Sequence, residues 1–294
     1  MGAMDANTEL SDDATEVSRY VLEQDYVVDG ERNIETFWTA IVSIIGYEPL
    51  ADFNGAMAAM NYGAGRFSSL NPSIAGRWVE HAEQHIPGML LGLIFANIDS
   101  IGATVRTWAE IKLYRAAGNI PIVACCGRKP DQIKFAEHIK QLSAEQNVSY
   151  HFAQRVDIGK CDANLSSAIT KSTIYFIEAM LASVTYPGLI CVDLADVFNA
   201  LKARKSVDIF RFSAPSFAQL VDALRVKIQV GTTINLDKPS VIATLFAPSS
   251  LKLNEVANCF STLKGHLPNE ALLVLAALAD AQRSEYTLYL VVCE

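Results

Sequence analysis

Apolar positions along the chain fall into two patterns: short continuous runs and longer segments with a helical period. Continuous runs predict buried strands at 89–96 and 120–126, and a helical period predicts a helix at 103–117 between them. Near-continuous apolar strands that alternate with helices are typical of a parallel sheet covered on both faces. The first half of the chain is therefore predicted to be an α/β domain.

The same two patterns predict the remaining elements. Helices are expected at 33–45, 72–85, 130–146, 196–203, 215–227 and 252–265, and strands at 148–154, 189–192, 207–213, 240–248 and 287–293. The segment 271–278 fits a strand or a helix, because it is rich in alanine and leucine. Residues 162–184 predict a long helix that is apolar on several sides, and we expect it to lie between two packed layers.

These elements divide the chain into four parts. Residues 1–32 are expected to form a tail that is partly disordered or tag-derived, because the opening MGAM has the look of a cloning remnant and the residues after it are polar and acidic. Residues 33–161 are expected to form the first α/β domain and residues 162–186 the central helix. Residues 187–294 mix strands and helices and predict an α+β domain.

Composition and charge narrow the possible partners and the compartment. The chain has 294 residues and 51% hydrophobic content, enough for a sizeable core. A formal net charge of −8 without any Lys/Arg-rich run argues against a nucleic-acid partner. No apolar run is long enough to span a bilayer, so we expect no membrane insertion. The six cysteines lack metal-binding spacing, so we predict no metal site and buried, reduced thiols in a cytoplasmic protein.

The segment PGLICVDLADV, residues 187–197, follows the central helix. It resembles a loop of the FtsZ/tubulin superfamily, and of FtsZ more closely than tubulin, in which a Pro-Gly-Leu turn precedes Asn-hydrophobic-Asp-Phe-Ala-Asp-Val. The C-terminal segments SVIATLFAPSSLKLNEVANCFSTLKG and EYTLYLVVCE also resemble this family, as do NPSIAGRWVEHAEQH and WAEIKLYRAAGNIPIVACCGRKP upstream. The resemblance covers the chain from about residue 65 onward and implies an FtsZ/tubulin-like fold.

The resemblance gives the two aspartates of this loop a role. In the family, two acidic residues here reach from one subunit into the nucleotide pocket of the next and help to activate the attacking water, and Asp193 and Asp196 occupy both positions. A carboxylate pair can orient water beside a phosphate and its counterion. Pro187 and Gly188 belong to the same implied interaction surface. The sequence leaves a structural alternative open, in which Asp196 caps a helix and Asp193 ends a strand.

The nucleotide-binding signature of the family is largely missing. The resemblance places Gly-Gly-Gly-Thr-Gly-Thr/Ser-Gly on NIDSIGA, residues 97–103, where only Ser100 and Gly102 agree. Asn97 adds a side chain where phosphate oxygens need room, and Asp99 adds a negative charge facing a polyanion. Lys171 stands where the family has an aspartate that reads guanine, and an ammonium cannot accept guanine's N–H donors. We expect a degenerate site without a cofactor; GTP would be its ligand if the pocket functions after all.

These features predict an FtsZ-like pseudo-GTPase that keeps the loop acting on a neighbour's nucleotide and has lost catalysis in its own pocket. The leading hypothesis is a modulator or cap of an FtsZ-type filament, with an FtsZ-type protein as its partner. One alternative is a nucleotide-independent filament or scaffold in which the chain is its own partner, and another is a divergent polymerising GTPase. An enzyme of another class ranks last, because the sequence has no Walker-type loop, dinucleotide fingerprint or nucleophile elbow.

Overall fold

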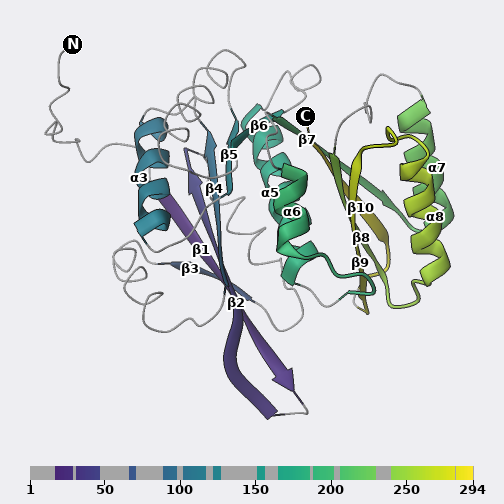
Figure 1. Ribbon diagram of the computed structural model, residues 1–294, viewed down its shortest axis with the longest axis horizontal. Helices are drawn as coiled ribbons and strands as arrows, with labels where there is room; N and C mark the ends of the chain where they lie inside the picture. Colours follow the sequence, from purple (N-terminus) through teal and green to yellow (C-terminus); the bar gives the residue numbers. More distant parts are fainter. Residues whose placement is uncertain are drawn as a thin grey trace, which may run out of the picture.

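A computed structural model describes twelve segments of the chain: residues 17–28, 31–46, 66–70, 89–97, 102–116, 122–126, 151–155, 165–185, 188–201, 206–229, 240–281 and 283–293. The helices predicted at 72–85 and 130–146 lie outside these residues. All strands of the described part belong to one ten-stranded sheet in the order β3-β1-β2-β4-β5-β6-β7-β10-β8-β9 (Figure 1).

The strands are β1 (Val17–Val28), β2 (Glu31–Ile45), β3 (Arg66–Leu70), β4 (Met89–Asn97), β5 (Ile122–Cys126), β6 (His151–Arg155), β7 (Ser206–Ala214), β8 (Ser240–Pro248), β9 (Leu272–Asp280) and β10 (Tyr286–Cys293). The helices are α3 (Ala103–Ala116), α5 (Leu165–Thr185), α6 (Leu194–Leu201), α7 (Phe217–Gln229) and α8 (Leu253–Lys264). Most predicted elements are confirmed to within a few residues. Segment 271–278 is a strand, since β9 pairs in parallel with β8 along its whole length.

The predicted parallel sheet is confirmed for β2, β4, β5 and β6, which pair in parallel with one another. β6 also pairs in parallel with β7, through the residue pairs from Ala153↔Ser206 to Arg155↔Asp208. Beyond that junction β7, β10 and β8 are antiparallel. One continuous sheet therefore runs across the boundary that the sequence suggests between the first domain and the last.

Two predictions near the N-terminus are wrong. The predicted helix at 33–45 is strand β2, and the predicted tail at 1–32 contains strand β1, which pairs with β2 in an antiparallel hairpin. Val42, Ile44 and Ile45 are fully buried in β2. Their β-branched side chains favour a strand that is covered on both faces, and this tertiary environment outweighs the helical spacing of the apolar residues.

The hairpin of β1 and β2 extends beyond the rest of the sheet (Figure 1). β3 pairs with β1 only over Arg19–Glu23, and β4 pairs with β2 only from Trp38 onward. Among the described pairings, Gln24, Tyr26–Val28 and Glu31–Asn33 therefore pair only within the hairpin, and the register shifts between Gln24 and Tyr26.

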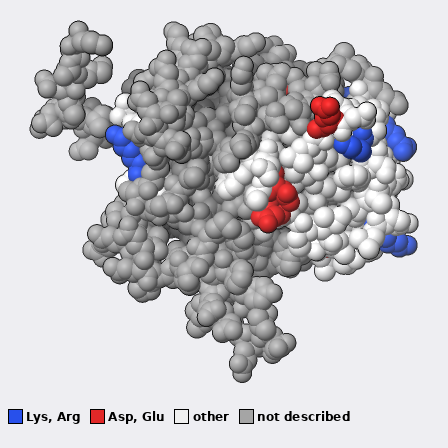
Figure 2. All heavy atoms as spheres, viewed as in Figure 1, with Lys and Arg blue, Asp and Glu red and all other residues white. Residues whose placement is uncertain are grey.

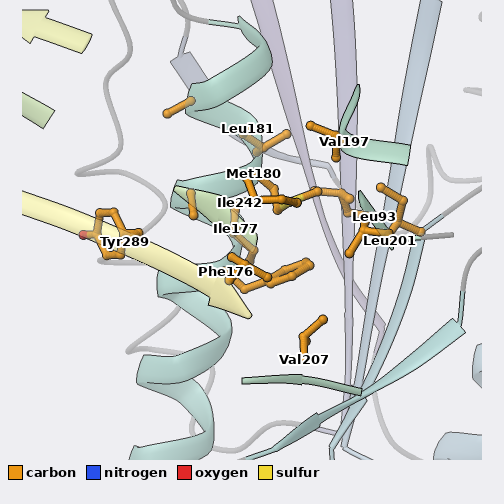
Figure 3. Packing of buried hydrophobic residues seen from close by; sticks show 14 of the residues in the cluster. Leu93, Phe176, Ile177, Met180, Leu181, Val197, Leu201, Val207, Ile242 and Tyr289 are labelled. Carbon is orange, nitrogen blue, oxygen red and sulfur yellow. The ribbon is translucent and has the colours of Figure 1, made fainter. Parts of the chain in front are cut away.

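Helix α5 lies at the centre of the larger core. Six apolar residues of this helix are at most 1% exposed: Phe176, Ile177, Ala179, Met180, Leu181 and Ala182. They pack against strands of both halves of the sheet and against α6, as Figure 3 shows for Leu93, Val197 and Ile242. The prediction that the central helix lies between packed layers is confirmed, and its burial on several sides explains its apolar sequence.

The C-terminal half of the sheet is covered on both faces. Helices α5 and α6 pack on one face, with Ile242, Val274 and Val291 beneath them. Helices α7 and α8 pack on the other, over Val241, Leu245 and Leu290. Successive residues of a strand point to opposite faces, so strands buried on both sides need the continuous apolar runs seen in β8 and β10.

Candidate functional site

The loop between α5 and α6 is held against the edge of β9. The backbone N–H of Ile190 donates to the carbonyl oxygen of Ala277 at 3.3 Å, and the N–H of Ala277 donates to the carbonyl of Ile190 at 3.1 Å. These two hydrogen bonds form an isolated antiparallel bridge, so the predicted strand at 189–192 is wrong. The bridge fixes the position of the loop relative to the sheet.

Gly188 allows this close approach. A Cβ atom at position 188 would lie 2.5 Å from the carbonyl oxygen of Ala277 and 2.8 Å from Leu278 Cδ2. The first of these neighbours is backbone and cannot rotate away. The glycine of the predicted interaction surface therefore has a structural role in seating the loop; Pro187 lies outside the described residues.

Replacing Gly188 with alanine is expected to lower the free energy of unfolding by about 1–3 kcal/mol, because the added methyl group forces the loop away from β9. Urea denaturation of the variant measures this loss. Alanine at Gly265, where the nearest contact would be 3.3 Å, serves as a milder comparison in the same sheet half. Equal stability of wild type and Gly188→Ala would show that the loop does not need this close contact.

Asp193 and Asp196 are both exposed at the start of α6. Asp193 is the N-cap residue, because its Oδ1 accepts a hydrogen bond from the backbone N–H of Ala195 at 2.9 Å. Asp196 lies in the first turn, where its charge favours the helix dipole. The structural alternative from the sequence assigned the helix cap to Asp196. In the structure the cap is Asp193, and Asp196 is not a cap residue. Figure 2 shows acidic side chains at the surface over the α6 region.

Two neighbours of the aspartates add exposed surface. Leu189 is 45% exposed. Cys191 is also exposed, so the prediction of buried thiols is wrong at this position, whereas Cys259 and Cys293 are buried as predicted. Burial raises the pKa of the Cys259 thiol to about 12, which keeps it protonated. Cys191 follows the bridged residue Ile190, and its thiol donates to the carbonyl oxygen of Gly188 at 3.6 Å.

The residues predicted for the degenerate nucleotide loop lie around the end of β4 and the start of α3. Asn97 is the last residue of β4 and is half-buried. Gly102 precedes α3 with a φ of 77°, a left-handed conformation that favours glycine. Asp99 and Ser100 lie outside the described residues. Lys171 is exposed on α5 and offers only hydrogen-bond donors, so it does not fit the donor edge of a guanine base.

Helix α3 is tied to β2 behind this region. The Ser43 hydroxyl donates to Glu110 Oε2 at 2.8 Å and lies 3.2 Å from the Tyr114 hydroxyl, and all three residues are buried.

Among the residues that the structure describes, no group of three His, Cys, Asp or Glu side chains could hold a metal ion. In the same part of the chain, no helix is long and apolar enough to cross a membrane.

A polar cluster that sequence reasoning missed ties α5 to the C-terminal sheet. Glu178 accepts hydrogen bonds from Arg283 Nη2, at 3.0 Å, and from the Tyr289 hydroxyl. Burial, and next the Glu178 carboxylate, raise the pKa of Tyr289, so this phenol remains a donor at neutral pH. Glu178 is the only acidic residue of α5. A carboxylate in a buried helix needs hydrogen-bonding or charged partners. The isolated Glu178 in an apolar helix could therefore have indicated this cluster from the sequence.

The chain is related to known proteins by structural similarity and not by sequence matches. Neither a protein-family model nor a curated protein sequence matches the chain. An empty FtsZ dimer from M. jannaschii aligns with a TM-score of 0.55 and 14% identity, over 75% of this chain and 67% of that one. The W319Y mutant of M. jannaschii FtsZ gives 0.54 and 15%, over 76% and 72%. GDP-bound CetZ1 from Haloferax volcanii gives 0.50 and 11%, over 75% and 71%. The chain has an FtsZ/tubulin-like fold.

Proposed function

We propose that this protein is an FtsZ-like pseudo-GTPase that modulates or caps an FtsZ-type filament through the surface around Asp193 and Asp196. The observation that carries the proposal is the display of both carboxylates at the exposed start of α6, on a loop bridged to β9. A fixed loop presents charges to another molecule at little cost in conformational entropy. The proposed partner is an FtsZ-type protein with an open nucleotide face.

The chemistry of the pair supports an action on a neighbour's nucleotide. Two carboxylates can polarise a water molecule and attract the counterion of a phosphate. The substitutions in the chain's own pocket support the loss of its turnover. Asn97 ends the buried strand β4 where the family signature begins with glycine, and Lys171 replaces an acceptor with a donor.

Calorimetric titration with GTP and magnesium, together with chromatography of nucleotide released on denaturation, tests the loss of the pocket. The expected result is neither heat of binding nor retained nucleotide. Micromolar binding of GTP would instead identify a divergent polymerising GTPase, whose turnover would then be measured.

A second experiment tests the action on a filament, with FtsZ of the same organism as the partner. We expect the protein to change FtsZ sedimentation and GTP turnover, and we expect Asp193→Asn and Asp196→Asn to remove this effect. Asparagine caps helices as well as aspartate does, so Asp193→Asn should keep stability within about 0.5 kcal/mol, whereas Asp193→Ala should cost about 1 kcal/mol.

Glu270→Gln, at another exposed carboxylate, is the matched control and should act on FtsZ as the wild type does. FtsZ assembly and GTP turnover that stay unchanged by the wild-type protein would reject the proposal. In that case, nucleotide-free sedimentation of the chain by itself would favour the alternative of a self-assembling scaffold.

A further inference from the structure

Two buried hydroxyl groups on β8 donate to the helices that flank the candidate site. The Ser240 hydroxyl donates to the carbonyl oxygen of Ala200 in α6 at 2.6 Å, and the Thr244 hydroxyl donates to that of Ala179 in α5 at 3.0 Å. Ser240 and Thr244 are both fully buried. A buried hydroxyl without a partner is costly, so each of these two residues favours the helix position that supplies its acceptor.

Both hydroxyls lie on the same face of β8. Alternate residues of a strand share a face, so Ser240 and Thr244 lie with Ile242 and Phe246 on the side of α5 and α6. On the opposite face, which α7 and α8 cover, the strand presents only apolar residues: Val241, Ala243, Leu245 and Ala247. The polar positions in the strand are therefore restricted to the face that supports the candidate site.

Helix α6 is short, and hydrogen bonds anchor it to the sheet at both ends. Its eight residues span about 12 Å, and helices this short are not stable in isolation. Just before the helix, Ile190 is bridged to Ala277 of β9. In the last turn of the helix, Ala200 accepts the hydrogen bond from Ser240 of β8. Because β8 pairs with β9, two neighbouring strands hold the two ends of this segment.

Asp193 and Asp196 lie in the chain between these two anchors, and Asp196 is about one helical turn before Ala200. The apolar contacts beneath α6 are non-directional, whereas a hydrogen bond fixes both a distance and a direction. A helix anchored at one end alone could pivot on its apolar side and carry its exposed side chains with it. We propose that Ser240 is a positioning residue, whose hydrogen bond to Ala200 sets the direction in which α6 presents Asp193 and Asp196.

Hydrogen exchange of the full chain, followed by mass spectrometry, tests this placement. The N–H groups of residues 195–197 donate to Asp193 and report on the start of α6. Ser240→Ala removes the hydroxyl, and these amides should then exchange roughly 2- to 10-fold faster, because the net contribution of one hydrogen bond corresponds to about this factor. Ser240→Thr keeps a hydroxyl donor and should restore slow exchange.

Thr244→Val is the matched control, because it removes a buried hydroxyl from the same face of β8, but one that bonds to α5. Exchange at residues 195–197 should stay at the wild-type rate in this variant, whereas a general loss of stability would act on both variants alike. Circular dichroism checks that all variants fold. Wild-type exchange in Ser240→Ala, or equally fast exchange in Thr244→Val, would overturn the proposal.

The same variants connect the placement to the action on a filament, a step that rests on the proposed function. Ser240→Ala should lose part of the wild-type effect on FtsZ GTP turnover, and Thr244→Val should keep it. A wild-type chain without any effect on FtsZ would reject the proposed function, while the exchange experiment would still decide the role of Ser240 in placing α6. Faster exchange in Ser240→Ala together with an undiminished effect on FtsZ would overturn the link between this placement and the action on FtsZ.

Discussion

Replacing Phe176 with alanine is expected to lower the free energy of unfolding by about 3–5 kcal/mol, the largest single-residue effect that we anticipate. Phe176 is fully buried in α5, and its ring meets that of Phe95 edge-on, with centroids 5.6 Å apart and planes at 74°. Phe95 belongs to β4, in the N-terminal half of the sheet. The substitution removes this aromatic contact and leaves a cavity where the two halves share one core.

Urea denaturation followed by tryptophan fluorescence and by circular dichroism measures the loss. If the shared core couples the halves, the wild type should unfold in one transition by both probes, and Phe176→Ala should separate the two curves. Lys171→Ala, on the exposed part of the same helix, should stay within about 0.5 kcal/mol of the wild type. A Phe176→Ala variant within about 1 kcal/mol of the wild type would contradict this account of the core.

Removal of the Glu178 carboxylate is expected to cost about 3 kcal/mol, because one group loses its acceptor and another loses an ion pair. The Tyr289 hydroxyl would lose its acceptor, and the Arg283 guanidinium would lose one of its two ion pairs. Arg283 would retain the ring of Phe246, 4.1 Å from its Cζ, and Asp280 at 3.6 Å. Glu178→Gln should cost less than Glu178→Ala, because the amide oxygen still accepts a hydrogen bond.

A double variant isolates the hydroxyl. In Glu178→Ala/Tyr289→Phe the buried donor is removed together with its acceptor, so part of the stability should return relative to Glu178→Ala. Chemical denaturation of the four proteins of this cycle gives the coupling energy. Additive effects of the two single substitutions would mean that the hydrogen bond between Glu178 and Tyr289 contributes nothing measurable.

The C-terminal part of the fold was predictable from sequence because its patterns are unambiguous. Strands β8 and β10 are mostly apolar, and α7 and α8, which precede and follow β8, have clear helical periods. Segment β9 was open to two interpretations, since its alanines fit helix and strand alike. Pairing with β8 decides for a strand, and pairing between distant segments cannot be read from local composition.

The N-terminal hairpin could not be predicted for the same reason. The apolar residues of β2 recur at spacings that also suit a helix. Pairing with β1 and β4 at its two edges, together with the burial of Val42, Ile44 and Ile45, makes the strand favourable. In the candidate site, the two aspartates and Gly188 were found from the sequence. The cap made by Asp193 and the contact of Gly188 with β9 depend on atomic positions, and a motif specifies residues without specifying their neighbours.

The bridge between Ile190 and Ala277 has a consequence for the solubility of the protein. β9 is the last strand in the sheet order, and its free side is the place where a strand from a misfolded or neighbouring chain would add. The loop occupies the backbone groups of Ala277, near the middle of Leu272–Asp280. An incoming strand would find no continuous row of donors and acceptors there. The segment that carries Asp193 therefore covers part of this strand edge and should hinder amyloid-like addition of further strands.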